Sequence, residues 1–255
     1  MHFFVAVWHW YTTASNWEGQ GGIPERALAQ LELSGLVVVA ASVLGIGFGY
    51  LLGHSGHGGF LAVNAANAAR AVPSLALLTL LVSWPLISLK GGGFYASFFA
   101  LLALAIPPVL TNAYIGMREV DVDLLEAATS LGMSSWQRFF RVEAPLAAPL
   151  ALAGLRTASV EVVATSTLAA YVSYNDLGGF IFTGLNTNNP VESFCGALLV
   201  ALLAGLTDVV LNVTSRRLAP VGAPRPPSDP ARTGLAGALR REVVRARRGQ
   251  SNALT

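Results

Sequence analysis

Five long apolar segments divide this chain of 255 residues, and polar or glycine-rich stretches separate them. A helix of roughly 20 apolar residues is long enough to cross the hydrocarbon core of a bilayer. Runs of this length predict an all-α, polytopic membrane protein with about five transmembrane helices, and they count against a soluble enzyme with a large core. The expected spans are residues 33–52, 71–89, 94–114, 146–171 and 193–213.

The first two spans contain residues that shape how they lie in the membrane. Arg70 is expected at the cytoplasmic interface, because an arginine at the bilayer centre costs at least about 2.5 kcal/mol. Gly45, Gly47 and Gly49 are small enough to allow close packing against another helix. Between the last two spans, the polar stretch 172–192 is expected to be a loop.

Charge is scarce and unevenly distributed along the chain. Only 12% of the residues are charged, about half the share of an ordinary soluble domain. From residue 216 to the end the balance is +7, whereas the rest of the chain carries −5. Basic residues beside a membrane helix indicate the cytoplasmic side, and nucleic-acid binding by the tail is the weaker alternative. With five spans, we expect a cytoplasmic C-terminus and an external N-terminus in a multi-pass protein of the cell membrane.

Three regions follow from this pattern. Residues 1–30 are expected to be an external, interfacial segment, whose tryptophans suit the lipid–water boundary. Residues 31–215 are expected to form the transmembrane domain, with a polar cytoplasmic insert at 118–145. Residues 216–255 form a basic tail, and its polar, proline-broken composition predicts disorder.

The insert at 118–145 begins with the pattern of a short capped helix. Asp121 and Asp123 suit a helix start, and Glu126 is spaced three residues after Asp123 for a capping box with it. Gly132 is expected to end the helix in the left-handed conformation.

A second short helix is expected directly after the first. Ser134 and Gln137 have the spacing of its cap, and Pro145 is expected to end it before the fourth span begins. Two capped helices in a row also suit an amphipathic hairpin that lies on the membrane without a partner.

The spacing of this insert resembles the EAA loop, by which permease subunits of ATP-binding cassette importers bind their ATPase. The order is Glu126-Ala127-Ala128, then Gly132, then an apolar-x-apolar sequence that ends at Pro145. The resemblance implies that the ATPase-coupling residues are Glu126, Ala127, Ala128, Gly132 and Pro145.

The resemblance widens to the glycine betaine/carnitine/choline permeases over residues 33–213. It rests on the segments 71–78, 108–116, 142–149, 153–158, 164–170 and 177–179. It implies the binding-protein-dependent importer permease fold and ATP-driven import of quaternary ammonium osmoprotectants. The positions that depart from the pattern of the family are Arg70, Thr111, Ala113, Glu161 and the run 173–176.

The partners and cofactors follow from the same resemblance. We expect a cytoplasmic ATPase dimer, a second permease subunit (itself or a paralogue), an extracytoplasmic substrate-binding protein and membrane lipid, and no nucleic acid. The chain has no phosphate-binding Gly-x-x-x-x-Gly-Lys-Ser/Thr loop. No cofactor is therefore expected on this chain, and ATP and Mg are expected on the partner ATPase subunits. No catalytic residue is expected, and no metal site, because His54 and His57 have only a weak spacing for one.

Polar residues in or shortly before the expected spans, together with Pro73, are candidates for a translocation path, because polar groups in the membrane are costly. The candidates are Asn64, Asn67, Pro73, Ser74, Glu161 and Thr165. Asn64, Asn67, Arg70 and Ser74 are spaced to share one helix face. Arg156 and Glu161 are spaced to pair with each other or with other helices, and Glu161 is interpreted as a carboxylate that attracts a cationic substrate. Two other functions stay open: import of an amino acid or polyamine by the same machinery, and an ATP-independent secondary carrier.

Overall fold

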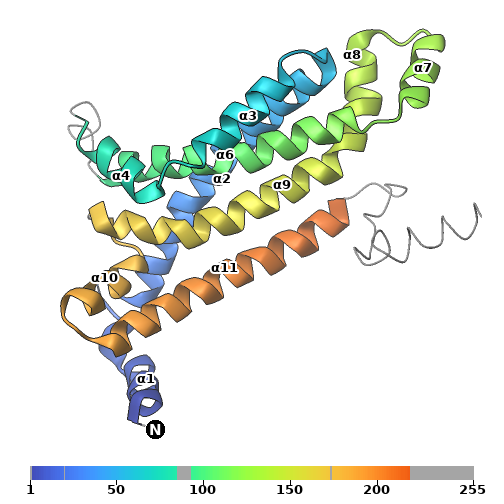
Figure 1. Cartoon of the computed structure of the whole chain (residues 1–255). Helices are drawn as coiled ribbons and strands as arrows, with labels where there is room; N and C mark the ends of the chain where they lie inside the picture. The colour runs from blue at the N-terminus through green and yellow to red at the C-terminus, as the bar shows by residue number, and fades with distance from the viewer. Residues whose placement is uncertain (1, 20, 85–92, 173, 219–255) are drawn as a thin grey trace, which may run out of the picture. The chain divides into compact units, whose positions relative to one another are not determined.

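The computed structural model describes residues 2–19, 21–84, 93–172 and 174–218, and these residues form helices and turns without a strand. This confirms the all-α fold. The helices, labelled as in Figure 1, are α1 (His2–Thr12), η1 (Ala14–Asn16), α2 (Ile23–Ser55), α3 (Gly59–Ala69), α4 (Ser74–Val82), α6 (Gly93–Arg118), α7 (Val122–Ser130), α8 (Ser135–Arg138), η2 (Phe139–Glu143), α9 (Ala144–Thr165), η3 (Ser166–Val172), α10 (Gly178–Asn186) and α11 (Pro190–Leu218).

Four helical segments of the described chain are long and apolar enough to cross a membrane. They are Ile23–Ser55, Gly93–Arg118, Ser135–Val172 and Pro190–Ser215. They correspond to the first, third, fourth and fifth expected spans. Most of the basic tail expected at 216–255 and part of the second expected span lie outside the described residues.

The second expected span differs from the prediction, because its described part, 71–84, contains only the short helix α4, and a separate short helix, α3, precedes it. α3 has 11 residues and α4 has 9, so each is about 15 Å long at 1.5 Å per residue. Arg70 caps the end of α3, and Pro73 precedes α4. Proline has no amide hydrogen and disfavours helical backbone in the residue before it, which explains the break.

α2 begins earlier than the apolar pattern indicated. It starts at Ile23, ten residues before the expected span, with Pro24 in its first turn and Glu25 beside the helix N-terminus. Proline is pre-organised for this position, and an acidic side chain is favourable there. The first membrane helix therefore starts inside the segment 1–30 that was expected to be interfacial.

α2, α6 and α9 pack together around the main apolar core (Figure 1). The core residues are Leu33, Val37 and Ala41 of α2, Leu101, Ala105 and Val109 of α6, Ala158 and Val162 of α9, and Ala169 of η3. Small and β-branched side chains dominate this set, which lets the helix backbones approach closely.

Glycines at every fourth position of α2 set its distance from α6. A Cβ added at Gly45 would lie 2.8 Å from Val109 Cβ, and one at Gly49 would lie 2.7 Å from Ala113 Cβ. A Cβ added at Gly53 would lie even closer to the Met117 side chain, whereas one at Gly47 would have no atom within 4 Å. The packing role predicted for Gly45 and Gly49 is confirmed, and the one predicted for Gly47 is wrong because Gly47 lies on the opposite face.

The N-terminal helix packs on the end of α11 and on α10. The rings of Trp10 and Phe180 meet edge to face at 5.2 Å, and Tyr11 donates a hydrogen bond to the Cys195 carbonyl at 2.9 Å. α10 itself lies within the stretch 172–192 that was expected to be a loop. Burial of Leu177 and Phe180 against α2 and α11 explains why this polar stretch still forms a helix.

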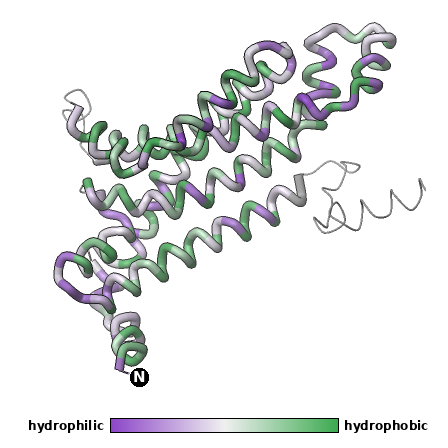
Figure 2. The backbone as a smooth tube through the Cα atoms, viewed as in Figure 1, coloured by the Kyte–Doolittle hydropathy of each residue, from purple (hydrophilic) through white to green (hydrophobic). Residues whose placement is uncertain are grey.

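The outer faces of the long helices are apolar. On α11, Leu202, Leu206 and Val209 are largely exposed, and on α2 the same is true of Val43 and Phe48. Figure 2 shows that hydrophobic positions run along the long helices, while hydrophilic ones gather around α7 and α8 and at the turn between α10 and α11. Apolar faces of this length are suited to contact with lipid.

Candidate functional site: the coupling loop and a charged groove

α7 is the first helix of the predicted coupling loop, and its cap differs from the expected one. Asp121 is the N-cap, and its carboxylate accepts a hydrogen bond from the Asp123 amide at 2.9 Å. The capping box expected between Asp123 and Glu126 is therefore wrong, because Asp123 already lies inside the helix. Glu126 is exposed, and its carboxylate is available to a partner.

Gly132 ends α7 as predicted. Its φ is +79°, in the left-handed region. The Met133 amide bonds to the Ala128 carbonyl at 3.2 Å, and the Gly132 amide bonds to the Thr129 carbonyl at 2.9 Å. These two bonds form a Schellman motif, which closes the helix end. A Cβ added at Gly132 would meet no atom within 4 Å, so its outer side is open to another protein.

The exposed surface of this loop carries large apolar side chains among its polar ones. Leu131 is 80% exposed, and Leu124, Trp136 and Phe140 are also largely exposed. Of the five predicted coupling residues, Glu126, Ala127, Gly132 and Pro145 are exposed, while Ala128 is buried. Exposed apolar patches with a polar rim mark sites of protein contact, so the loop is suited to docking a partner.

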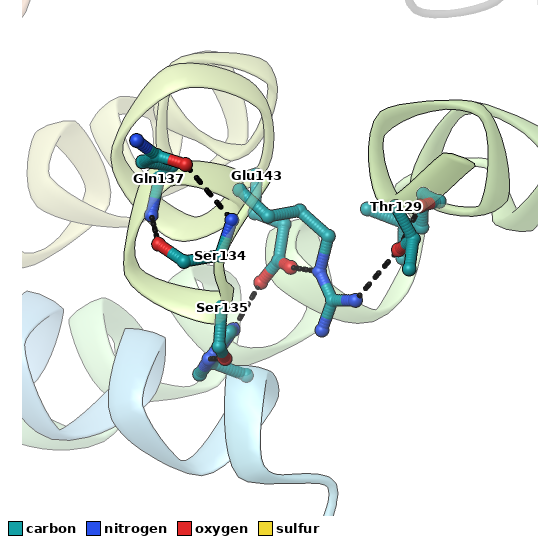
Figure 3. Close-up of polar contacts among 8 residues, drawn as sticks. Thr129, Ser134, Ser135, Gln137 and Glu143 are labelled. Carbon is teal, nitrogen blue, oxygen red and sulfur yellow. Dashed lines mark hydrogen bonds and ion pairs between the residues drawn. The ribbon is translucent and has the colours of Figure 1, made fainter. Parts of the chain in front are cut away.

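The second helix of the loop, α8, has the predicted cap. The Ser134 hydroxyl accepts from the Gln137 amide at 3.3 Å, and the Gln137 side chain accepts from the Ser134 amide at 2.8 Å (Figure 3). This reciprocal pair is a capping box. α8 then continues through the π-helical turn η2 into α9 without a break.

Pro145 does not end the second helix, contrary to the prediction. It lies in the first turn of α9, directly after the π-helical turn Phe139–Glu143. A proline there removes one backbone donor, and the wider turn before it accommodates the ring. α8, η2 and α9 therefore form one continuous rod that joins the loop to the fourth span.

Glu143 holds the loop against the end of α2. Its side chain is 5% exposed. It accepts from Arg138 Nε at 2.8 Å and bonds to His54 Nδ1 of α2 at 2.5 Å. His54 Nε2 also bonds to the Ser135 hydroxyl at 2.8 Å, and Arg138 Nη1 reaches the Thr129 hydroxyl at 3.3 Å (Figure 3). Buried polar groups satisfied in this way fix a single geometry.

A groove of about 830 Å³ runs along α9 and α11, with Arg70 at the end of α3 contributing to its wall. Its lining carries two ion pairs and the hydroxyls of Thr157 and Ser215, among alanine, leucine, valine and proline side chains. This volume is within the range of pockets that hold small molecules.

Each ion pair of the groove joins two different helices. Arg70 Nη2 lies 2.6 Å from Glu161 Oε2. Arg156 binds Asp208 of α11 through two parallel contacts of 2.7 Å, from Nε to Oδ1 and from Nη2 to Oδ2. Arg156 and Glu161 therefore pair with other helices and not with each other, which is one of the two expected arrangements.

The predicted path residues fall into three places. Glu161 lines the groove. Ser74 and Thr165 line a separate cavity of about 10 Å³, large enough for roughly one water molecule. Asn64, Asn67 and Pro73 are exposed and line neither cavity. The prediction that Asn64, Asn67, Arg70 and Ser74 share one helix face is wrong, because the helix breaks between α3 and α4.

One residue and one contact of the site were not predicted from the sequence. Asp208 is the only charged residue of the span 193–213, and an acidic group inside an apolar span should have been a candidate. The hydrogen bond between His54 and Glu143 could not be predicted from the sequence pattern, because these residues are 89 positions apart.

Comparison with known families places the chain among transport proteins. The family model described as "Binding-protein-dependent transport system inner membrane component" matches residues 41–220. This range contains the predicted coupling loop, both ion pairs of the groove and all the described helices from α3 to α11.

Two relatives have similar sequences over about half of this chain. The glycine betaine/carnitine/choline transport system permease protein OpuCB of Bacillus subtilis (strain 168) is 38% identical over 136 residues, which are 53% of this chain and 63% of that protein. The choline transport system permease protein OpuBB of the same organism is 39% identical over 139 residues, which are 54% of this chain and 64% of that protein. The match therefore spans just under two thirds of the length of these relatives.

A solved structure of the MetNI methionine ABC transporter, in an inward-facing conformation, has a similar fold. The TM-score is 0.67 at 18% identity, and the match covers 77% of this chain and 95% of that one. At this identity the similarity shows the fold alone, and it confirms the importer permease fold expected from the sequence.

Proposed function

This chain belongs to the family of binding-protein-dependent transport system inner membrane components, and we propose that it is the permease subunit of an ATP-driven importer. The family and the four apolar helices make it a multi-pass membrane protein. Its solutes are quaternary ammonium osmoprotectants such as glycine betaine, choline and carnitine. The names of the two relatives support this substrate class.

The observation that supports this function most directly is the form of the coupling loop. α7 is a short helix closed at both ends, by Asp121 and by the motif at Gly132. It exposes Glu126 and apolar side chains on an open surface. A short rigid helix of this kind can be moved as one body by a bound ATPase.

The loop is also connected to the membrane helices in a way that suits coupling. The rod α8–η2–α9 leads from the loop directly to the charged groove. The contacts of Glu143 with Arg138 and His54 tie the same loop to α2. In the proposed mechanism, closure of two ATPases moves α7, and this motion opens the path alternately to the two sides of the membrane.

The partners belong to the proposal as well. A cytoplasmic ATPase dimer binds ATP and Mg, while this chain binds no cofactor and is not itself catalytic. A second permease subunit, identical or related, completes the path, and an extracytoplasmic binding protein delivers the solute. The loop and the C-terminus face the cytoplasm, and the N-terminus faces outward.

Uptake of labelled glycine betaine and choline tests this function, in cells that lack their own osmoprotectant transport. The chain is expressed with its neighbouring ATPase and binding protein, as wild type and as Gly132→Glu. Gly19→Glu is a matched control, because Gly19 has a φ of +81° and is also open within 4 Å, but lies in the N-terminal segment. We expect Gly132→Glu to lower uptake at least about tenfold, which corresponds to about 1.4 kcal/mol of lost docking.

The other outcomes separate the alternatives. Equal uptake by both variants would overturn the coupling role of the loop. Absence of uptake of either solute, with the ATPase still bound at the membrane, would keep the importer and favour another solute such as an amino acid or polyamine. Uptake that continues without the ATPase would identify a secondary carrier.

A further inference from the structure

We propose that the ion pair between Arg70 and Glu161 is exchanged for the solute, and that it selects zwitterionic solutes over purely cationic ones. In the bound state the carboxylate of the solute pairs with Arg70, and its quaternary ammonium group pairs with Glu161. This inference rests on the proposed import function and specifies the solute that the groove accepts.

The position of the pair makes both charges accessible from the groove. Arg70 and Glu161 both line it, and their side chains are 35% and 29% exposed. The groove has room for a small solute beside them, at about 830 Å³. Alanine and valine side chains next to Glu161 provide apolar surface for the methyl groups of an ammonium ion.

The two ion pairs of the groove differ in how firmly they are held. Arg156 and Asp208 are joined by two parallel bonds between long, regular helices. Bidentate pairs of this kind are among the strongest. Arg70 and Glu161 share a single hydrogen bond, and Arg70 caps a helix directly before the break at 71–73. The pair of Arg70 with Glu161 is therefore the one that can open without moving a transmembrane helix.

Charge balance explains why a zwitterion suits this site. The groove carries two arginines and two carboxylates, so its lining has no net charge. A cation that bound Glu161 would leave Arg70 without a partner in a partly desolvated site, and an unpaired charge there is costly. A zwitterion replaces both partners at once and leaves every charge paired.

The test compares uptake of glycine betaine, a zwitterion, with uptake of choline, a cation, in Arg70→Gln and Glu161→Gln. For each variant, the ratio of betaine uptake to choline uptake is divided by the same ratio in wild type with the same binding protein. The selectivity of the binding protein then cancels. Arg70→Gln frees Glu161, and we expect the betaine-to-choline ratio to fall about tenfold, equivalent to about 1.4 kcal/mol. Glu161→Gln frees Arg70, and we expect the ratio to rise by a similar factor.

Three further uptake results bear on the inference. If both variants change uptake of the two solutes by the same factor, the pair is only structural and the inference is overturned. If the wild type carries neither solute, the proposed substrate class fails first, and the inference fails with it. The double swap Arg70→Glu, Glu161→Arg restores the pair, and we expect it to return the ratio to that of wild type.

A second measurement leaves both charges in place, in case the single variants do not assemble. Thr157 lines the groove and is exposed, whereas the single native cysteine, Cys195, is buried. In Thr157→Cys, we expect glycine betaine to slow labelling by a thiol reagent and choline at the same concentration to have a smaller effect. Equal protection by both solutes, or protection by neither, would overturn the inference.

Discussion

Asp176 is the most unusual single residue outside the membrane spans. It lies just before α10, is fully buried, and both of its carboxylate oxygens are without a hydrogen-bond partner among the described residues. Burial raises the pKa of Asp176 from 3.8 to about 7, and the nearby Gly178 and Gly179 amides and the Arg26 charge oppose this shift more weakly. A carboxyl group in such a site is favoured in its neutral form.

This pKa predicts a stability that falls as the pH rises. The folded state holds the proton of Asp176 more tightly than the unfolded state does. The contribution of Asp176 to the free energy of unfolding is therefore fully present below about pH 4. It is lost as the pH rises to about 7, by up to about 1.4 kcal/mol per pH unit. Asp176→Asn resembles the protonated form, so we expect a higher melting temperature than wild type at pH 8 and little difference at pH 4. Thermal unfolding in detergent between pH 4 and pH 8 measures the melting temperatures of both proteins.

The control for this prediction is Asp123→Asn, which removes an exposed carboxylate from the first turn of α7. We expect its pH profile to follow that of wild type. The assignment to Asp176 would be wrong if Asp176→Asn lost stability between pH 4 and pH 7 as steeply as the wild-type chain.

At the scale of the helices, the contact between α2 and α6 depends on glycines that face α6. A methyl group at Gly49 would lie 2.7 Å from Ala113 Cβ and 2.8 Å from the Leu110 carbonyl oxygen. Since backbone atoms cannot move aside easily, we expect Gly49→Ala to lower the free energy of unfolding by about 1–3 kcal/mol.

Gly47 provides the matched control on the same helix. It lies two residues away, is exposed, and has no atom within 4 Å of an added Cβ. Alanine is favoured over glycine inside a helix by about 1 kcal/mol, so we expect Gly47→Ala to be neutral or slightly stabilising. Melting temperatures of the two purified variants give the comparison, and equal effects would contradict the packing seen here.

The same helices show which parts of the structure could be predicted from the sequence. Four of the five expected apolar spans and the cap at Ser134 and Gln137 were confirmed, because both depend on residues that are close in the chain. The break at Pro73 also has a local signal, because proline marks helix boundaries, but the short length of α4 after it has none. The pairs of Arg70 with Glu161 and of Arg156 with Asp208 depend on which helices pack together, and hydrophobic periodicity does not determine this.

At the scale of the whole molecule, polar and apolar surfaces are separated along the described helices. Hydrophilic residues gather at α7 and α8, at one end of the long helices, while α1 and α10 pack at the other end of α11 (Figures 1 and 2). If the long helices cross the bilayer, α1 and α7 are exposed on opposite sides of it. In the orientation that we propose from the positive-inside rule, the side of α7, with Arg118, Arg138 and Arg141, faces the cytoplasm.

Cysteine labelling in whole cells tests this orientation, and the chain is well suited to it. Cys195 is buried, so the wild-type chain is expected not to react with a membrane-impermeant thiol reagent. Ser15 and Ser130 are both exposed, the first between α1 and α2 and the second at the end of α7. We expect Ser15→Cys to be labelled in intact cells and Ser130→Cys only after the membrane is permeabilised. The reverse pattern would place the coupling loop outside the cell, where it could not reach an ATPase, and would contradict the proposed function.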